Sequence, residues 1–400
     1  MTKLDTLSSA FDWRSEGIDW PVTSDVGPGL AGVVALETEV MWLDPSSGQL
    51  AYRGVPIEEL AGQVDFEGVA YLLINGKQPE ESADDFEQFK QGLRESRTLP
   101  PEVVSLVRSL YPETHPTRML RAGLSAVGCH ELTVDDDLAG EAQWRELRVV
   151  GQVASLVAEI CRHRSGLPSR PPRSGDSLAE GLLAALTGRE PEADEIRALN
   201  LLWVLYAAHG LDAPTFTSMI VASCLADPYY NFVAGLSALR GSKSGGAAEA
   251  VLEQILPLQS PEWAEKWVRS TLENGRTIAG FGHRAYRMPD PRVVVLRKEF
   301  AALARDRGKS DLFEVARAVE TAATAALAPK GVHINVNFYG ALLFHLLGAD
   351  APLVPCLMAI GRMAGTAALV REALETIRLY RPLSRYVGPE ERRFDQESES

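Results

Sequence analysis

Four short polar stretches interrupt an otherwise apolar sequence, and each holds residue types that could do chemistry. The densest is AGFGHRAYRMPDPR, residues 279–292. Arginine binds carboxylate and phosphate groups through paired N–H donors. Its mixture with glycine and histidine here predicts a small-anion site rather than only an exposed basic loop. The stretch is not a dinucleotide-binding fingerprint, because the third glycine and a preceding strand are missing. Its polar members are His283, Arg284, Arg287, Asp290 and Arg292.

The other three stretches place polar residues beside predicted turns. His209, in AAHGLDAPTFT, follows an apolar run and could be either a core histidine or a ligand-binding residue. GSKSGG, residues 241–246, is a glycine-flanked turn between two predicted helices, where an enzyme could present a working side chain. APKGVHINVNFYG spans residues 328–340, and its polar residues include Lys330, Asn335 and Asn337.

Two later arginines lie beside apolar segments. Arg362 follows APLVPCLMAIG, and a charge near buried surface is unfavourable unless paired, so we expect it to have an anionic partner. Arg381 precedes a proline that ends a predicted helix and could simply contact the helix C-terminus. Together with Arg292 these guanidiniums suit a small dicarboxylate, and a histidine among them could polarise a ketone.

The sequence predicts a mainly α fold with a small β-hairpin near the N-terminus. EVMWLDPSSGQLAYRG has two short apolar runs around the turn at residues 44–48 and is typical of a hairpin. Beyond it, apolar residues recur at helical spacing almost everywhere, as in the segment after residue 85. Ser82 and Asp85 resemble a capping box at the start of that segment. Residues 163–176, rich in Pro, Ser, Gly and Arg, are predicted to form a loop.

Composition narrows the class of protein and of partner. The chain has 400 residues, 46% hydrophobic residues and a net charge of −14. That acidity argues against nucleic acid as the main partner. The sequence shows no signal peptide and no membrane-spanning run, so we expect a cytoplasmic protein without a membrane partner. We expect no metal site, and we interpret the cysteines as buried thiols; they are Cys129, Cys161, Cys224 and Cys356.

Taken together, the motifs resemble those of the citrate synthase family along most of the chain. GFGHRAYRMPDPR is similar to the family's GFGHRVY…DPR signature, and NVNFYG to NVDFYSG. AIGRMAG resembles the GRTAG-type motif, RPLSRYVGP the terminal RP…Y.G segment, and HPTRMLRAGLSAVG the HPM-containing helix. LAGVVALETEV and AYRGVPIEELA resemble the family's N-terminal segments.

The resemblance implies an almost wholly helical homodimer, in which a large and a small domain close over the substrates. We expect residues 1–240 and 346–400 to form the large domain, and residues 241–345 to form the small domain with the CoA-binding and catalytic loops. Family members condense acetyl-CoA with oxaloacetate and hydrolyse the citryl-CoA formed. The resemblance therefore implies a small dicarboxylate and an acyl-CoA as ligands. Coenzyme A thioester would be a co-substrate, and no cofactor would be permanently bound.

The resemblance also assigns roles to individual residues. His209 matches a substrate-binding histidine, and His283 matches the histidine that polarises the oxaloacetate ketone. Arg292 and Arg362 match carboxylate-binding arginines, while Arg381 matches one that completes the partner subunit's site. The positions assigned to CoA binding are Arg287, Lys330, Gly280 and Gly282.

The departures from the family pattern fall on the thioester half of the reaction. Ser244 stands where GPLHGG has the histidine that donates to the thioester oxygen. Asn337 stands where the family has the aspartate that takes a proton from the acetyl methyl group. Ala248 replaces an asparagine, and Lys243 is unusual in the catalytic turn. We therefore assign altered catalytic roles to Ser244, Asn337 and Lys243, beside His283.

Three interpretations follow from these departures. The chain could be a condensing enzyme with altered chemistry, such as decarboxylation of a malonyl-type thioester, which needs no carboxylate base. It could instead be a non-catalytic dicarboxylate- or CoA-binding protein that acts as a sensor or as partner to an active paralogue. Ser244 could also be the nucleophile of a hydrolase or acyltransferase, although its surroundings do not form a G-x-S-x-G elbow.

Overall fold

The computed structural model describes residues 28–30, 33–131, 142–173, 175–376, 378–382 and 386–389. Its contacts divide the chain into two units, residues 1–37 and residues 38–400. The first unit contains the short helix η2 (Pro28–Leu30). All residues of the predicted site lie in the second unit.

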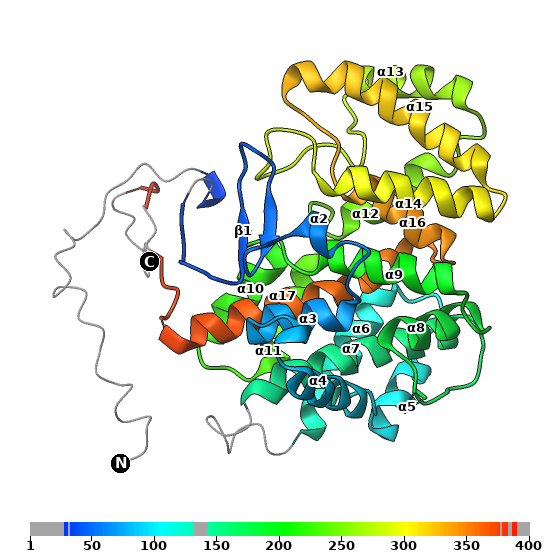
Figure 1. Ribbon diagram of the computed structural model, residues 1–400. Helices are drawn as coiled ribbons and strands as arrows, with labels where there is room; N and C mark the ends of the chain where they lie inside the picture. Colours follow the sequence, from blue (N-terminus) through cyan, green and yellow to red (C-terminus); the bar gives the residue numbers. More distant parts are fainter. Residues whose placement is uncertain are drawn as a thin grey trace, which may run out of the picture. The chain divides into compact units, whose positions relative to one another are not determined.

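The predicted mainly α class is confirmed, because helices account for most of the described chain (Figure 1). The predicted loop at residues 163–176 is confirmed for its described residues from 165 on, but residues 163 and 164 end the preceding helix. The α-helices are α2 (Ile57–Leu60), α3 (Phe66–Asn75), α4 (Ala83–Glu95), α5 (Pro101–Ser109), α6 (Pro116–His130), α7 (Ala142–Arg164), α8 (Leu178–Thr187), α9 (Ala193–Tyr206), α10 (Ala213–Ser223), α11 (Pro228–Leu239), α12 (Gly246–Ile255), α13 (Ala264–Glu273), α14 (Arg292–Asp306), α15 (Ser310–Leu327), α16 (Asn337–Leu346) and α17 (Val354–Thr376). The short 3-10 helices of this unit are η3 (Pro79–Glu81), η4 (Pro261–Trp263), η5 (Ala328–Lys330) and η6 (Ala351–Leu353).

Helix α17 is the central element of the core. Every residue from Val354 to Val370 is buried, and the helix packs against α3, α7, α9 and α10. A helix that is apolar on all sides must be surrounded by protein or lipid. Residues 351–376 are long and apolar enough to span a bilayer, but the whole of their apolar window is buried inside the structure. Protein therefore surrounds this helix in the described fold.

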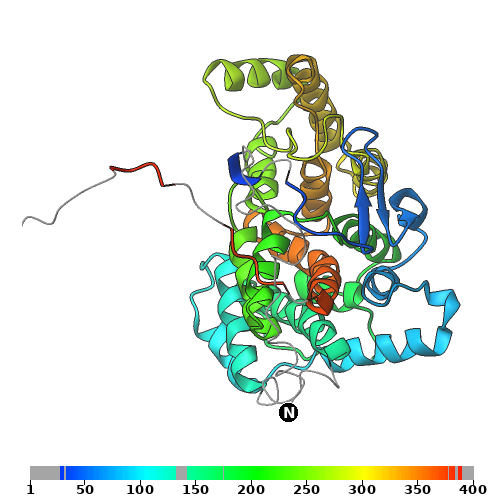
Figure 2. The same ribbon diagram turned by 90° about the vertical axis from the view of Figure 1, so that its left-hand side faces the viewer.

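The helices of residues 246–346 form a packed group on one side of this core. Helix α16 packs against α12 and α14, and α15 packs against α13 and α14. Figures 1 and 2 show α13 and α15 at one end of residues 38–400, away from α4 and α5. This group carries the turn at residues 241–246, the stretch 279–292 and the stretch 328–340.

The predicted hairpin is confirmed and gains a third, two-residue strand. Strands β1 (Met41–Leu43), β2 (Leu50–Tyr52) and β3 (Val55–Pro56) form an antiparallel sheet in the order β1-β2-β3. The backbone N–H of Arg287 lies 3.4 Å from the carbonyl oxygen of Pro45 in the hairpin turn. The hairpin tip therefore contacts the far end of the predicted anion-binding stretch.

Two local predictions are wrong. Cys129 and Cys224 are exposed rather than buried, because they lie near the ends of α6 and α10, where each thiol contacts a carbonyl of its own helix. Cys161 is buried as predicted, and burial raises its pKa to about 12. Ser82 precedes α4 as expected, but its side chain makes no capping hydrogen bond.

Two loops that carry predicted site residues are joined along their backbones. Asn335 donates its backbone N–H to Gly280 at 2.9 Å, and its side-chain amide donates to the carbonyl of Gly282 at 2.7 Å. Gly282 in turn donates to the carbonyl of His333 at 2.7 Å. At Gly280 the φ angle is +81°, and a Cβ there would lie 2.7 Å from the Cβ of Phe338. The pairing therefore requires a glycine at this position.

We predict that Gly280→Ala destabilises the fold by at least about 3 kcal/mol, because it adds a backbone clash to left-handed strain. Gly275→Ala is the matched control, since Gly275 has a φ of +68° but open space around its missing Cβ. That control should lose only about 1–2 kcal/mol. Urea unfolding of both variants checks the prediction, and equal losses would contradict the close approach at Gly280.

Candidate active site

His283 is held as a neutral hydrogen-bond donor. Its Nδ1 accepts the backbone N–H groups of Ala285 at 3.0 Å and Tyr286 at 2.9 Å. The neutral ring must then carry its proton on Nε2. Burial lowers the pKa of His283 to about 4, and the charge of Arg292 acts in the same direction. At neutral pH the residue therefore offers an N–H that can polarise a carbonyl oxygen but brings no positive charge.

That donor points to His209. The two Nε2 atoms lie 2.9 Å apart. Since His283 carries the proton, His209 accepts it through Nε2 and has its own proton on Nδ1, which is buried without a partner among the described residues. Burial, with the nearby Arg292, holds the pKa of His209 well below its ordinary value. The ring of Tyr286 packs on both, 4.6 Å from His283 and 5.4 Å from His209 between centroids.

Arg292 is the fixed charge beside these rings. Its Nε and Nη2 donate to the two carboxylate oxygens of Asp290 at 2.9 and 2.7 Å, and its Nη1 donates to the carbonyl of Leu205 at 3.1 Å. Burial alone would lower the pKa of Arg292, but the Asp290 carboxylate reverses the direction and raises it. A guanidinium has five N–H donors. Two of the five N–H donors make none of these hydrogen bonds and could donate to a ligand.

Arg362 has the anionic partner predicted for it. Its Nη1 lies 3.1 Å from the carboxylate of Asp212, and the side chain is buried in α17. The geometry does not make a hydrogen bond, because the same Nη1 lacks a well-aligned acceptor in the described structure. Asp212 also caps α10 by accepting the backbone N–H of Thr215 at 3.0 Å. The pair is therefore an ionic contact that a competing carboxylate could replace.

Asn337 is the first residue of α16 and lies beside the same cluster. The hydroxyl of Tyr206 is 3.3 Å from the Asn337 Oδ1 and 3.3 Å from the carbonyl oxygen of Val336. The backbone N–H of Asn337 donates to the Asn335 side chain at 3.0 Å. Within the described residues its side-chain NH₂ has no acceptor, so this group is available to a ligand.

Ser244 and Lys243 lie on a tight turn that leads into α12. The turn closes through the backbone N–H groups of Ser244 and Gly246, which both donate to the carbonyl of Gly241. Lys243 is exposed and Ser244 is half-buried. Neither side chain makes a hydrogen bond or ion pair with any described residue. A Cβ at Gly245 would lie 2.8 Å from the Leu239 carbonyl, so the turn depends on a glycine there.

Buried polar contacts anchor this turn to the rest of the protein. Glu249, in the first turn of α12, lies 3.2 Å from the Nε2 of His115, and His115 caps α6. Arg240, which precedes the turn, approaches the same carboxylate to 3.6 Å. The motif similar to the HPM-containing helix therefore positions the turn.

The remaining predicted residues lie on the surface. Arg287, Lys330 and Arg381 are exposed, and none pairs with a carboxylate in the part of the chain that the structure describes. Among the described residues Arg381 donates only to the carbonyl of Pro382, at 3.2 Å. The structure thus joins His209 to His283 directly, places the charge of Arg292 close enough to lower the pKa of both, and leaves Arg381 outside this group.

Sequence reasoning missed several members of the cluster. The missed residues are Tyr206, Tyr286 and Asp212. Each lies within a few residues of a predicted ligand-binding residue in the sequence, and that proximity could have indicated them. Their roles depend on tertiary contacts, which local patterns do not report. No group of three or more metal-binding side chains occurs among the described residues.

Known proteins resemble this chain over nearly its full length. The family model described as "Citrate synthase, C-terminal domain" matches residues 29–383. Citrate synthase 2 of Bacillus subtilis is 34% identical, with 92% of this chain and 97% of that protein covered. The 2-methylcitrate synthase of Mycobacterium tuberculosis is 33% identical, with 92% of both chains covered.

A solved structure agrees with these relatives. The citrate synthase of Thermoplasma acidophilum, in a ternary complex with carboxymethyl coenzyme A and oxaloacetate, superposes with a TM-score of 0.87. It is 28% identical, and the match covers 93% of this chain and 98% of that one.

The depressed pKa of His283 predicts a pH-dependent stability. An imidazole with a pKa of about 4 in the folded protein and about 6.5 when unfolded binds more protons in the unfolded chain. Stability is therefore lost as pH falls from about 6.5 toward 4, by about 2 kcal/mol at pH ~5. Urea unfolding of the wild type and of His283→Gln, each at neutral pH and at pH ~5, checks this. The variant should lose less stability than the wild type, and equal losses would contradict a neutral His283.

Proposed function

The chain belongs to the citrate synthase family, and from that premise we propose that it condenses a coenzyme A thioester with a 2-oxo acid such as oxaloacetate. We propose further that it forms the thioester enolate by altered chemistry. Its relatives carry the names citrate synthase and 2-methylcitrate synthase, which supports condensation as the reaction class. The structural neighbour bound to a CoA derivative and oxaloacetate supports the pair of ligands.

The observation that carries the proposal is the fixed Nε2–H of His283 beside Arg292. A 2-oxo acid has a ketone oxygen that becomes an alkoxide when carbon attacks it. In the structure this N–H donates to His209, and a substrate ketone oxygen that replaced His209 as its acceptor would have its developing charge stabilised. The free N–H groups of Arg292 and the loosely paired Arg362 would bind the substrate carboxylates. Arg381 would come from a second subunit, so the proposal includes a homodimer.

The thioester half cannot work as it does in the family pattern. Asparagine is not a proton acceptor at neutral pH, and loss of a general base typically slows a reaction by about 10²–10⁴. Loss of one preorganised donor at the thioester oxygen slows it by about 10²–10³ more. Together these removals weaken transition-state binding by roughly 5–9 kcal/mol if they are independent. Acetyl-CoA should therefore be a very poor substrate.

Loss of CO₂ from a malonyl-type thioester would make the enolate without a base. The bond between the carboxylate and the α-carbon breaks, its electron pair becomes the enolate, and the α-carbon then bonds to the ketone carbon. The Nε2–H of His283 would donate a hydrogen bond to the new alkoxide, which takes its proton from solvent. Asn337 is neutral and has a free NH₂ group, so it would not repel the extra carboxylate. Lys243 would attract that carboxylate, and the Ser244 hydroxyl would donate to the thioester oxygen.

The CoA moiety would bind at the edge of the same loops. Arg287 and Lys330 are exposed cations without carboxylate partners in the described chain, and they would contact its phosphates. Gly280 and Gly282 shape the loop between them. We keep the division into a large domain (residues 1–240 and 346–400) and a small domain (241–345) as part of this proposal, since closure between them would exclude water.

The first test is incubation with malonyl-CoA, labelled with ¹³C in its free carboxylate, and oxaloacetate. We expect labelled CO₂ together with a mass-detectable citryl adduct or citrate. Acetyl-CoA should give at least about 100-fold less product. His283→Gln, which keeps the size of the side chain, should lower product formation. Absence of both CO₂ and adduct would contradict the decarboxylative route.

A second candidate function is binding without turnover. It is favoured by Ser244 and Lys243, whose side chains make no hydrogen bond or ion pair with a described residue. Calorimetry with oxaloacetate separates the two candidates: binding in the absence of any product supports a sensor or partner role. A serine nucleophile has no such support, because no histidine, lysine or carboxylate contacts Ser244 among the described residues.

The family chemistry should return when both substituted residues are restored. We expect Ser244→His with Asn337→Asp to raise condensation of acetyl-CoA and oxaloacetate by about 100-fold or more over the wild type. Each single variant is a control and should gain much less, because donor and base act on the same proton transfer. Thiol release measures the rate. A double variant no faster than the singles would mean that further parts of the site are altered.

A further inference from the structure

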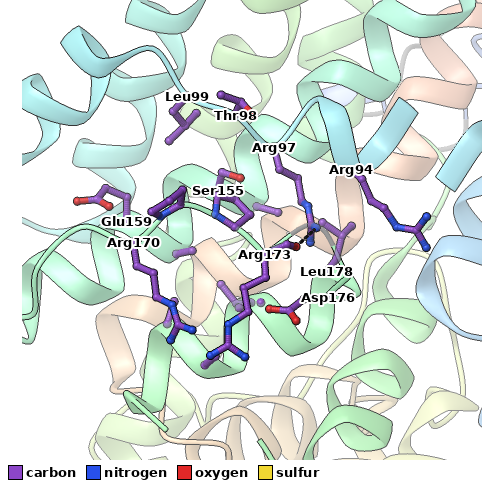
Figure 3. Close-up of a pocket in the computed structure, with 18 of the residues that line it drawn as sticks. Arg94, Arg97, Thr98, Leu99, Ser155, Glu159, Arg170, Arg173, Asp176 and Leu178 are labelled. Atoms are coloured by element: carbon purple, nitrogen blue, oxygen red, sulfur yellow. Dashed lines mark hydrogen bonds between the residues drawn. The ribbon is translucent and has the colours of Figure 1, made fainter. Parts of the chain in front are cut away.

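A cavity of about 380 Å³ lies apart from every residue assigned to the candidate active site (Figure 3). Its walls come from α4, α7 and α8, and from the segments that precede α5 and α8. This volume is in the range of pockets that bind small molecules. Figure 3 shows the side chains of Arg97, Ser155 and Arg173 among those lining it.

Two arginines of this cavity are buried and have no carboxylate partner among the described residues. Arg97 is 4% exposed; it donates to the carbonyls of Ser177 at 3.3 Å and Arg173 at 2.8 Å, and its Nε has no partner in the described structure. Arg162 is 8% exposed, and its Nε donates to the carbonyl of Pro168 at 2.7 Å. A buried guanidinium without a counter-charge destabilises the folded protein. An anion in the cavity would remove that penalty.

Arg173 is paired with Glu190, but no carboxylate of the described chain pairs with Arg97 or Arg162. The hydroxyl of Ser155 is buried with no partner among the described residues. Glu159, which could neutralise an arginine, is already bound by Arg108 and by the hydroxyl of Ser169. In all, five arginines and three carboxylates line the cavity of a chain whose net charge is −14. They are Arg94, Arg97, Arg162, Arg170 and Arg173, with Glu95, Glu159 and Asp176.

The acidic groups nearest Arg97 do not replace a bound anion. Burial lowers the pKa of Arg97, and Asp176 and Glu67 oppose that shift only partly. Glu67 is itself buried, which raises its pKa and disfavours its charged form. Neither carboxylate lies within ion-pair distance of Arg97 in the described chain. The guanidinium therefore still lacks a direct counter-charge.

The rest of the lining is apolar. It includes Leu99, Val104, Leu178 and Leu182 from the helices and loops on either side, and Pro171 and Pro172 from the loop before α8. A ligand that fills the cavity must therefore bury an apolar part as well as present a charge. Inorganic anions alone would leave these side chains in contact with water.

We propose that this cavity binds a small organic anion, in which a phosphate or carboxylate group is attached to an apolar body. Arg97, Ser155 and Arg162 bind the anionic group, and the apolar body packs between Leu178, Leu182 and the two prolines. The site is independent of the reaction proposed above, because it shares no residue with it.

Calorimetric titration of the full chain with phenyl phosphate and with phenylacetate tests the proposal, and the tighter of the two identifies the head group. We expect one site per chain, and inorganic phosphate should bind at least about tenfold more weakly. Saturating oxaloacetate should leave the affinity unchanged, because it occupies the other site. Absence of binding by both organic probes at millimolar concentration would overturn the proposal, and equal affinity for inorganic phosphate would overturn its apolar part.

Two variants locate the binding. Arg97→Gln should weaken binding by at least about tenfold, although it also loses two hydrogen bonds to carbonyls. Ala158→Leu places extra volume in the cavity without touching an arginine, and it should weaken binding to the same extent. Arg305→Gln, which removes an exposed arginine outside the cavity, is the matched control and should bind as the wild type does. Unchanged binding in both cavity variants would place the probes elsewhere and contradict the assignment.

Discussion

The buried ion pair of Asp290 and Arg292 is the interaction on which the site depends. Asp290 accepts from Arg292 through both oxygens, and its Oδ2 also accepts the backbone N–H of Val336 at 3.1 Å. One carboxylate thus joins the stretch that carries His283 to the segment that carries Asn337. Removal of either partner would leave an uncompensated buried charge. This would lower the free energy of unfolding by about 3–5 kcal/mol. The relative position of the two catalytic loops therefore depends on this pair.

The same pair sets the charge state of the site. The guanidinium is nearly inaccessible to solvent, so water screens its field poorly. Both neighbouring histidines feel that field, and it adds to burial in keeping them neutral. A neutral imidazole can donate to a ketone oxygen without forming an ion pair with the substrate carboxylates. The arginines remain free to bind those carboxylates, so the division of roles follows from one fixed charge.

Local patterns predicted the elements and the residues that act through local geometry. The hairpin, the loop before α8 and the dense stretch around His283 could be recognised because turn residues and periodicity are properties of neighbouring residues. Tyr206 and Asp212 could not, since each meets its partner only when distant segments pack. The burial of Cys129 and Cys224 was mispredicted because exposure depends on which helix face is covered. The sequence did not indicate a ligand-binding role for Arg97, because the lack of a counter-charge can be recognised only when all its neighbours in the fold are known.

The two halves of the site differ in how firmly the fold constrains them. His209, His283 and Arg292 are tied into buried contacts, so substitutions there would disturb the core. The turn at residues 241–246 instead depends on its backbone and glycines, and the side chains of Ser244 and Lys243 make no hydrogen bond or ion pair with the described residues. Asn337 has nearly the shape of aspartate and still accepts from Tyr206. Substitutions at Ser244, Lys243 and Asn337 should therefore cost little stability, whereas substitutions at His209, His283 and Arg292 should cost more.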